Sequence, residues 1–459
     1  MSALIDEQTL AQFDVPGPRY TSYPTADRFV EAFGESDYQA ALQLRRQTRS
    51  QAPLSLYVHL PFCESVCYYC ACNKVVTKNR SKAEAYLHDL ALEIDLQTQY
   101  LGEGQRLSQL HFGGGTPTYY SDEQLQGLMA VIRRKFELVP GGEYSIEVDP
   151  RTISADRLKS LLNMGFGRLS FGVQDFDPVV QRAVHRVQPY ADVERLMQTA
   201  RGLGFDSINL DLIYGLPMQT PESMAKTVEA AIALGPDRVA LYGYAHLPAR
   251  FKPQRRINEH ELPRAKDKVH MLASAIEQME RAGYVYIGMD HFAKPNDALA
   301  VARSQGRLHR NFQGYSTQPD CDLIALGVSA IGRVGNTYSQ NAKTLEEYSD
   351  ALHQGRLPIV KGMALGQDDV LRRAVIMSIM CQGKLDFDAI RLGFGVDVER
   401  YFERELEALT PLARAGLVEC GNDEIRVTER GWYVVRAVAM GFDRYLQGDA
   451  ERQRFSKII

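Results

Sequence analysis

Three closely spaced cysteines form the most reactive group in the sequence: Cys63, Cys67 and Cys70 stand in the run HLPFCESVCYYCACNK (59–74). Their spacing, C-x3-C-x2-C followed by Cys72 two positions later, comes directly after a β-rich run. Three thiolates on one short loop can hold three corners of a 4Fe-4S cluster. The fourth iron then has no protein ligand, and an open metal position is where a cofactor can coordinate. We therefore expect these three cysteines to be the metal ligands.

Zinc is the alternative metal for clustered cysteines. Structural zinc favours two separated pairs of ligands, and the sequence has no second pair elsewhere. We expect Cys72 to lie too close to Cys70 to reach another corner of the same cluster, and to serve in electron or proton transfer. His59, on the strand that leads into the loop, is expected in a similar catalytic role, although a lone histidine there is more often a core residue.

A glycine run, HFGGGTPT (111–118), follows the next β-rich segment. Glycines allow the backbone to approach a polar ligand closely and to adopt dihedral angles that other residues avoid. A GGG triplet alone is weak evidence of function. Its position one strand after the cysteine loop favours a ligand-binding role.

Short β-rich runs alternate with segments of helical period, and this order must position the cysteines and glycines. It predicts parallel strands joined by right-handed crossovers, and six such units curl into a partial or complete barrel with its functional residues at the strand ends. In the helical segment 121–136, Ser121 is expected to cap a helix with Gln124 three residues later. The six predicted strands are 54–60, 108–114, 143–149, 167–173, 207–213 and 238–244.

The two ends of the chain differ from this pattern. Residues 1–50 are expected to form an N-terminal arm, in which GPRYTSYPTA (17–26) is extended because it is too rich in glycine and proline for a helix. Segment 296–340 reads as loop-rich, and 409–446 as helix, hairpin and helix, an order that resembles a winged helix in a packing or lid role. The predicted domains are an arm (1–50), a barrel with its extension (51–355) and a mainly helical C-terminal domain (356–459).

The bulk composition limits the possible functions. With 45% hydrophobic and 24% charged residues, the 459-residue chain has an ordinary globular composition. Its net charge of -4 argues against bulk binding of nucleic acid. The N-terminal residues lack the features of a signal peptide, and no run is long and apolar enough for a membrane span, so we expect a cytoplasmic protein.

Taken together, the cysteine spacing, the aromatic Tyr69 before the third cysteine and the glycine run resemble the radical S-adenosylmethionine superfamily. This resemblance implies a partial (β/α)6 barrel of α/β class, related to the TIM barrel. It also implies that methionine's amino and carboxylate groups chelate the open iron, and that one-electron reduction yields a 5′-deoxyadenosyl radical.

A closer resemblance extends over nearly the whole chain. The sequence is similar to the oxygen-independent coproporphyrinogen III oxidase family at PGPRYTSYPTA (16–26), YVHLPFC (57–63), SIEVDPR (145–151), SFGVQDF (170–176), NLDLIYGLP (209–217), YAHLP (244–248), GMDHFA (288–293) and HRNFQGY (309–315). This resemblance implies oxidative decarboxylation of two propionates of coproporphyrinogen III to vinyl groups. The product is protoporphyrinogen IX, an intermediate of haem synthesis.

The family resemblance also implies two bound S-adenosylmethionine molecules. Residues matched to the family's first cofactor site are Tyr57, Gly114, Glu147, Ala245 and Ile331; those matched to the second are Tyr69, Gly115, Thr116, Gln174, Arg186 and Asp211. Glu147 and Asp211 lie within apolar runs, where a carboxylate needs a cationic or hydroxyl partner. A cofactor's ammonium or ribose would serve, and a salt bridge to an arginine is the alternative.

Several questions stay open at this point. A haem chaperone, or another radical enzyme acting on tetrapyrroles, is the alternative function. The expected partners are coproporphyrinogen III, an electron donor such as flavodoxin or ferredoxin, and an unknown electron acceptor, and we expect a monomer. Arg19, Tyr20 and Tyr23 of the arm are expected to close over the substrate, or else to brace the barrel permanently.

Overall fold

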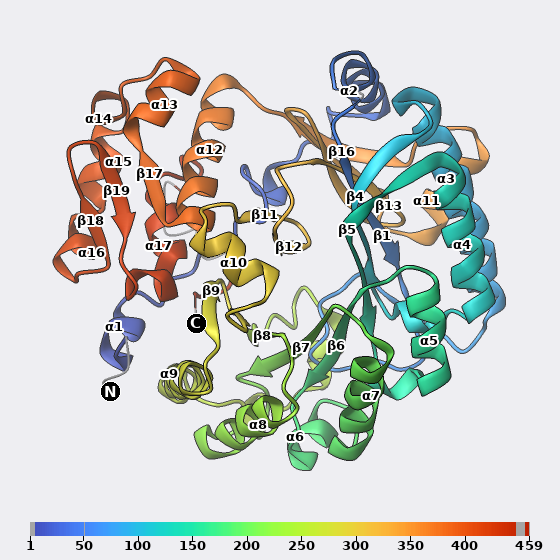
Figure 1. The fold of residues 1–459 in the computed structure, drawn as a ribbon, viewed down its shortest axis with the longest axis horizontal. Coiled ribbons are helices and arrows are strands. Elements are labelled where there is room, and N and C mark those ends of the chain that lie inside the picture. Colours follow the sequence, from blue (N-terminus) through green and yellow to red (C-terminus); the bar gives the residue numbers. More distant parts are fainter. Residues whose placement is uncertain (1–4, 50, 447–454, 459) are drawn as a thin grey trace.

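A barrel of parallel strands forms the larger part of the chain (Figure 1). The computed structural model describes residues 5–49, 51–446 and 455–458. Each of the six predicted strands is present and pairs in parallel with the next along the chain. They are β1 (Leu54–Leu60), β4 (Gln105–Gly114), β5 (Phe136–Val148), β6 (Arg168–Gln174), β7 (Ser207–Tyr214) and β8 (Arg238–Gly243). The predicted α/β barrel class is therefore confirmed.

Helices between these strands cover the outside of the barrel (Figure 1). The predicted cap is present. The Ser121 hydroxyl accepts from the backbone N–H of Gln124 at 3.2 Å, and the Gln124 side-chain oxygen accepts from the backbone N–H of Ser121. The helices of the crossovers are α3 (Ser81–Leu101), α4 (Asp122–Lys135), α5 (Ala155–Asn163), α6 (Pro178–Ala183), α7 (Tyr190–Leu203) and α8 (Pro221–Ala233), followed by α9 (Ala265–Arg281).

Segment 296–340 holds more regular structure than its loop-rich sequence indicates. Strand β13 (Asp322–Leu326) pairs in parallel with β1, which adds a seventh parallel strand that the sequence analysis missed. Its five residues are all buried, so they lack the polar alternation that marks a strand with one solvated face. Antiparallel strands extend the sheet at both ends: β14 (Ile331–Val334), β15 (Thr337–Asn341) and β16 (Ile359–Ala364) beyond β13, and β10 (His291–Ala293) and β9 (Val285–Gly288) beyond β8.

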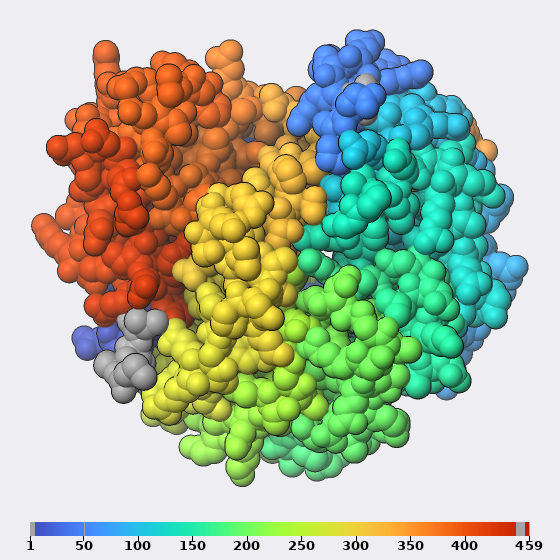
Figure 2. Space-filling view, viewed as in Figure 1, coloured from blue at the N-terminus to red at the C-terminus, as the bar shows by residue number. Residues whose placement is uncertain are grey.

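Helices predominate in the C-terminal region, which lies beside the barrel (Figure 1). The short hairpin β11 (His309–Asn311) and β12 (Gly314–Ser316) and helix α10 (Ala298–Ser304) lie between the two parts, and α10 covers that junction on the face seen in Figure 2. The C-terminal elements are α12 (Gln367–Gln382), β17 (Lys384–Asp386), α13 (Phe387–Phe394), α14 (Val398–Tyr401), α15 (Glu403–Ala408), α16 (Thr410–Arg414), β18 (Val418–Cys420), β19 (Glu424–Val427) and α17 (Val435–Met440).

The N-terminal arm packs against both parts. Between α1 (Glu7–Gln12) and α2 (Glu35–Thr48) the chain is extended, and its side chains Tyr20 and Tyr23 are completely buried. The Tyr20 hydroxyl donates to the Asp443 carboxylate at 2.9 Å. These contacts favour a bracing role for the two tyrosines. Among the described residues, none of the helices is both long and apolar enough to span a bilayer.

Candidate active site

The cysteine loop faces a cavity of about 440 Å³ at the carboxyl ends of the barrel strands; we call it the barrel cavity. Strand ends of a parallel barrel supply the catalytic groups of such folds, because the loops that follow converge there. The cavity is lined by Cys63, Cys67, Cys70 and Cys72 together with the predicted residues Tyr69, Gly114, Gly115, Thr116, Glu147, Gln174, Arg186, Asp211 and Ala245. Parts of the chain far apart in sequence thus meet at the cysteine loop.

Hydrogen-bond donors converge on two of the cysteine sulfurs. The Thr116 hydroxyl donates to Cys63 Sγ at 3.2 Å, and Arg186 Nη1 lies 3.4 Å from Cys67 Sγ. Arg151 Nη2 approaches the same sulfur at 3.7 Å. Thiolates are the form of cysteine that ligates a metal, and hydrogen-bond donors beside a sulfur favour that form. Burial nevertheless raises the pKa of the Cys63 thiol to about 11, although the Thr116 bond opposes this shift. The donors around Cys63 and Cys67 are groups from which the thiolate ligands of an iron–sulfur cluster would accept hydrogen bonds.

A buried carboxylate holds both arginines in place. Asp149 accepts from Arg151 Nη2 at 2.7 Å and from Arg186 Nη1 at 3.2 Å. Although burial opposes the charge, the two guanidiniums lower the pKa of Asp149 below its ordinary value. Arg186 is itself buried rather than solvated. Asp149 and Arg151 belong to the SIEVDPR run, and their position at a strand end was the signal that could have identified them.

The fourth cysteine is linked to the third. A hydrogen bond from Cys72 lowers the pKa of the Cys70 thiol to about 6, and the same bond raises the pKa of Cys72. Within the described part of the chain, no three Cys, His, Asp or Glu side chains are grouped tightly enough to ligate a single metal ion. A 4Fe-4S cluster makes a different demand, because each thiolate binds its own iron.

The glycine run is required by packing inside the protein. Gly114 has a φ of 114°, and a Cβ there would lie 2.6 Å from the His59 ring. A Cβ on Gly115 would lie 2.5 Å from the Pro61 backbone. The two glycines therefore let the strand end fold against the start of the cysteine loop, while they also line the barrel cavity.

Glu147 and Asp211 reach the cavity without an arginine partner. Glu147 accepts from the Gly114 N–H at 3.1 Å and lies 3.3 Å from His111 Nε2. Burial opposes its charge, but these bonds and the His111 ring lower its pKa. Asp211 accepts from the Ser170 hydroxyl at 3.0 Å and from the Asn209 amide at 2.8 Å.

Asp211 is the less satisfied of these two carboxylates. Burial, followed by repulsion from Glu147, raises the pKa of Asp211 to about 6. Among the described residues, no arginine pairs with either carboxylate within salt-bridge distance. The cavity therefore presents negative charge that a cationic or hydroxyl-bearing ligand would stabilise.

Gln174 and Gln254 are two further polar residues that line the barrel cavity. Gln174 ends β6 with a φ of 73°, a strained backbone for a residue other than glycine, and such strain is concentrated at functional sites. The Gln254 side chain is buried, and its amide donates to the carbonyls of Tyr69 at 3.0 Å and Ala245 at 3.2 Å. Gln254 thereby links the cysteine loop to the end of β8. It lies in the 3-10 helix η4 (Lys252–Arg256), whose sequence carries no signal of this role.

Three predicted residues lie outside the lining of the cavity. Tyr57 stacks on the His111 ring at 5.9 Å and so lies one side chain behind Glu147. Ile331 begins β14, opposite Gln340 in the next strand. His59 is buried, with its ring nitrogens bonded to the Tyr57 hydroxyl and the Asn73 carbonyl. Its contacts hold the cysteine loop, and its catalytic role stays a prediction.

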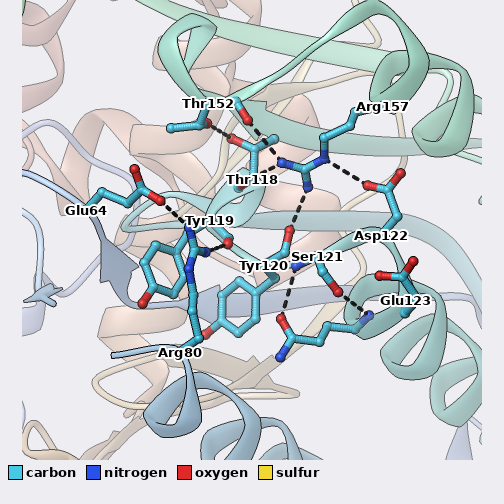
Figure 3. A pocket seen from close by; sticks show the side chains of 11 residues that line it. Glu64, Arg80, Thr118, Tyr119, Tyr120, Ser121, Asp122, Glu123, Thr152 and Arg157 are labelled. Atoms are coloured by element: carbon cyan, nitrogen blue, oxygen red, sulfur yellow. Dashed lines mark hydrogen bonds and ion pairs between the residues drawn. The ribbon is translucent and has the colours of Figure 1, made fainter. Parts of the chain in front are cut away.

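A second pocket, of about 520 Å³, lies at the start of α4 on the outside of the barrel (Figure 3). In this α4 pocket Arg157 donates to Asp122 and to three backbone carbonyls, those of Thr118, Thr152 and Tyr120, at 2.6–3.0 Å. Arg80 lies over the ring of Tyr119, donates to the Tyr119 carbonyl and pairs with Glu64. The chain itself therefore satisfies both guanidiniums.

Comparison with known proteins agrees with this geometry. The chain matches the radical SAM superfamily at residues 57–231 and the HemN C-terminal domain at residues 365–434. It is 48% identical to the oxygen-independent coproporphyrinogen III oxidase of Pseudomonas aeruginosa, over 99% of this chain and 98% of the relative. The corresponding protein of Escherichia coli is 46% identical over 99% of this chain and 98% of its own.

A solved structure gives the same result for the fold. The chain superposes with a TM-score of 0.91 and 45% identity on a structure described as coproporphyrinogen III oxidase (HemN) from Escherichia coli, a radical SAM enzyme. The match covers 96% of this chain and 99% of that one. The likeness therefore includes the arm and the C-terminal region as well as the barrel.

Proposed function

The chain belongs to the family of oxygen-independent coproporphyrinogen III oxidases within the radical SAM superfamily, and from this premise we propose that it converts two propionates of coproporphyrinogen III to vinyl groups. The product is protoporphyrinogen IX, and the enzyme is an oxidoreductase of haem synthesis. One observation carries this proposal: the cysteine loop, with cationic donors on its sulfurs, lines the same cavity as the residues predicted to bind the cofactor.

The chain's own residues supply position and charge for this reaction. When bound, the 4Fe-4S cluster and S-adenosylmethionine supply a 5′-deoxyadenosyl radical able to take a hydrogen from an unactivated propionate carbon, which no ordinary base could deprotonate. Cys63, Cys67 and Cys70 would hold the cluster. Arg186 and Thr116 stabilise negative charge on the sulfurs. Asp211 and Glu147 would orient hydroxyl or ammonium groups of the cofactor.

We infer two cofactor sites. The first would use Gly114, Glu147 and Ala245, with Tyr57 behind Glu147 and Ile331 at its margin. The second would use Tyr69, Gly115, Thr116, Gln174, Arg186 and Asp211. The inference is supported by the lining of the cavity, which holds every one of these residues except Tyr57 and Ile331.

The remaining features belong to the same proposal. An electron donor such as flavodoxin or ferredoxin would reduce the cluster, and an acceptor takes the electrons released by decarboxylation. A cytoplasmic, reducing location is supported by seven cysteines that are all free. We propose a monomer with an arm (1–50), a catalytic barrel (51–355) and a C-terminal domain (356–459), a division supported by the domain match at 365–434.

Anaerobic incubation of the reconstituted protein with S-adenosylmethionine, a reductant and coproporphyrinogen III tests the function. We expect mono- and divinyl products together with 5′-deoxyadenosine. Cleavage of S-adenosylmethionine without vinyl products would indicate another substrate. Stable stoichiometric haem binding without either product would instead indicate a haem chaperone.

A further inference from the structure

Two buried arginines have hydrogen-bonding groups that the chain does not satisfy. Arg310 and Arg436 are only 5% and 2% exposed. Within the described part of the structure, Nε and Nη1 of each guanidinium have no hydrogen-bond partner, although Arg436 Nη2 donates to the Lys457 carbonyl at 2.6 Å. Burying an unpaired donor costs free energy, and burying an unpaired charge costs considerably more. A ligand that accepts hydrogen bonds would remove this cost.

A row of aromatic rings connects Arg310 to the barrel cavity. Tyr242 lines the cavity, and the His291 ring packs edge-on against both Tyr242 and Tyr315, at 6.0 and 5.8 Å. The Arg310 guanidinium lies 4.6 Å from the Tyr315 ring centre. At the other end of this row, Arg19 lies 5.4 Å from the Tyr242 ring centre. Arg19 thus lies one ring behind the cavity lining, and Arg310, on β11, lies at the far end of the row; neither belongs to the lining itself.

Charged groups of both signs meet in this region. We define Arg19, Arg310 and Arg436 as the arginine cluster. Arg19 pairs with Asp290, and the carboxylates of Asp443 and Asp14 lie near tyrosines that Arg436 also approaches. Burial and repulsion from Arg19 lower the pKa of Arg436 to about 10, so it stays charged at pH 7. Burial and the charge of Arg310 lower the pKa of His291 to about 4, so that ring is neutral. Arg436 therefore keeps its charge, while the His291 ring of the aromatic row carries none.

We propose that the arginine cluster binds carboxylates of the tetrapyrrole while another of its propionates lies in the barrel cavity. This inference rests on the proposed function, because that substrate is a macrocycle with four carboxylates. A guanidinium presents paired N–H donors that match a carboxylate, and the aromatic row offers flat faces to the pyrrole rings. Arg19, whose side chain is 36% exposed, is the member of the cluster best placed to meet an incoming ligand.

The test separates loss of carboxylate binding from loss of the radical chemistry. The variants are Arg310→Gln, Arg310→Lys and Arg436→Gln, with Arg391→Gln as the control because Arg391 is an exposed arginine paired only with a carboxylate on its own helix. We expect Arg310→Gln and Arg436→Gln to raise KM for coproporphyrinogen III about 10- to 100-fold. Iron content and 5′-deoxyadenosine formation without substrate should stay at the wild-type level. Arg310→Lys should recover part of the loss, since lysine keeps the charge but not the paired donors.

Direct binding makes the test independent of turnover. The probe is coproporphyrin III, the coloured oxidised form with the same four carboxylates, compared with a porphyrin that carries two. Arg310→Gln should weaken binding of the first probe more than that of the second.

Equal KM and equal probe binding in the folded Arg310 and Arg436 variants would overturn the inference. If the wild-type enzyme formed no vinyl product but these variants still lost probe binding, the proposed function would fail and the carboxylate site would stand. Should the glutamine variants not fold, unchanged KM and probe binding in Arg310→Lys would overturn it.

Discussion

The barrel cavity and the α4 pocket use charged residues in opposite ways. In the α4 pocket, Arg157 makes four hydrogen bonds to the chain, and Arg80 pairs with Glu64. In the barrel cavity, Asp211 has no cationic partner among the described residues, and burial raises its pKa to about 6. Polar groups satisfied by the chain stabilise the fold, whereas groups left unsatisfied are available to a ligand.

Substitution of the cysteines should have the largest effect. Single Cys63→Ala, Cys67→Ala or Cys70→Ala variants should lose the cluster and all activity, because each removes a thiolate ligand. Cys72→Ala is the matched control within the same loop: it should keep its iron even if turnover falls. Iron and sulfide content after anaerobic reconstitution checks this. A fall in Cys72→Ala as deep as in the other three would show that no iron is left open.

Arg157→Ala in the α4 pocket should mainly reduce stability. The change leaves three backbone carbonyls and Asp122 without their donor, and we expect unfolding to become easier by about 2–4 kcal/mol. The folded variant should keep its KM for S-adenosylmethionine. Denaturant unfolding combined with steady-state kinetics measures both quantities. A raised KM with unchanged stability would assign the α4 pocket a role in ligand binding.

Asp211→Asn in the barrel cavity should stabilise the fold and weaken the binding of S-adenosylmethionine, whereas Arg157→Ala should reduce stability and leave that binding unchanged. Burial raises the pKa of Asp211 in the folded protein to about 6, above the ordinary value for an aspartate, so ionisation of Asp211 destabilises the fold as pH rises from that ordinary value toward 6. Without S-adenosylmethionine, the variant should be about 1–3 kcal/mol more stable than wild type at pH 7.5, and the gain should shrink toward pH 5. S-adenosylmethionine binding should weaken about tenfold or more. Unfolding at several pH values and equilibrium binding check these outcomes; reduced stability at pH 7.5 would contradict them.

Glu64→Gln should have the smallest effect. Glu64 and Arg80 are 46% and 50% exposed, and an exposed ion pair contributes about 0–1 kcal/mol. We expect a change in unfolding free energy within that range, further reduced at high salt, and unchanged activity. Glu64 follows Cys63 directly, so a large loss of cluster in this variant would show that the α4 pocket supports the loop and would weaken the contrast between the two regions.

Much of the fold and part of the site follow from local sequence patterns. Each of the six predicted strands is present, and Ser121 caps α4 as the S-x-x-Q pattern indicates. Strand β13 was missed because its five residues, Asp322 followed by four apolar residues, are all buried and carry no periodicity. The arm shows the limit of composition: its glycine and proline content predicts an extended chain, but not that Tyr20 and Tyr23 would be completely buried.

The chemistry expected of the cysteine loop can be predicted from the sequence, because the three thiolates that would hold one cluster lie within a few residues of one another. Which distant groups face that loop depends on the tertiary structure. Arg186 contacts Cys67 across 119 positions, and Arg19 pairs with Asp290 across 271. Burial raises the pKa of Asp211, and it leaves Nε and Nη1 of Arg310 without a hydrogen-bond partner among the described residues. Burial in turn depends on how the whole chain packs. Ligand spacing is a local property of the chain, whereas the environment that tunes a charge is a property of the fold.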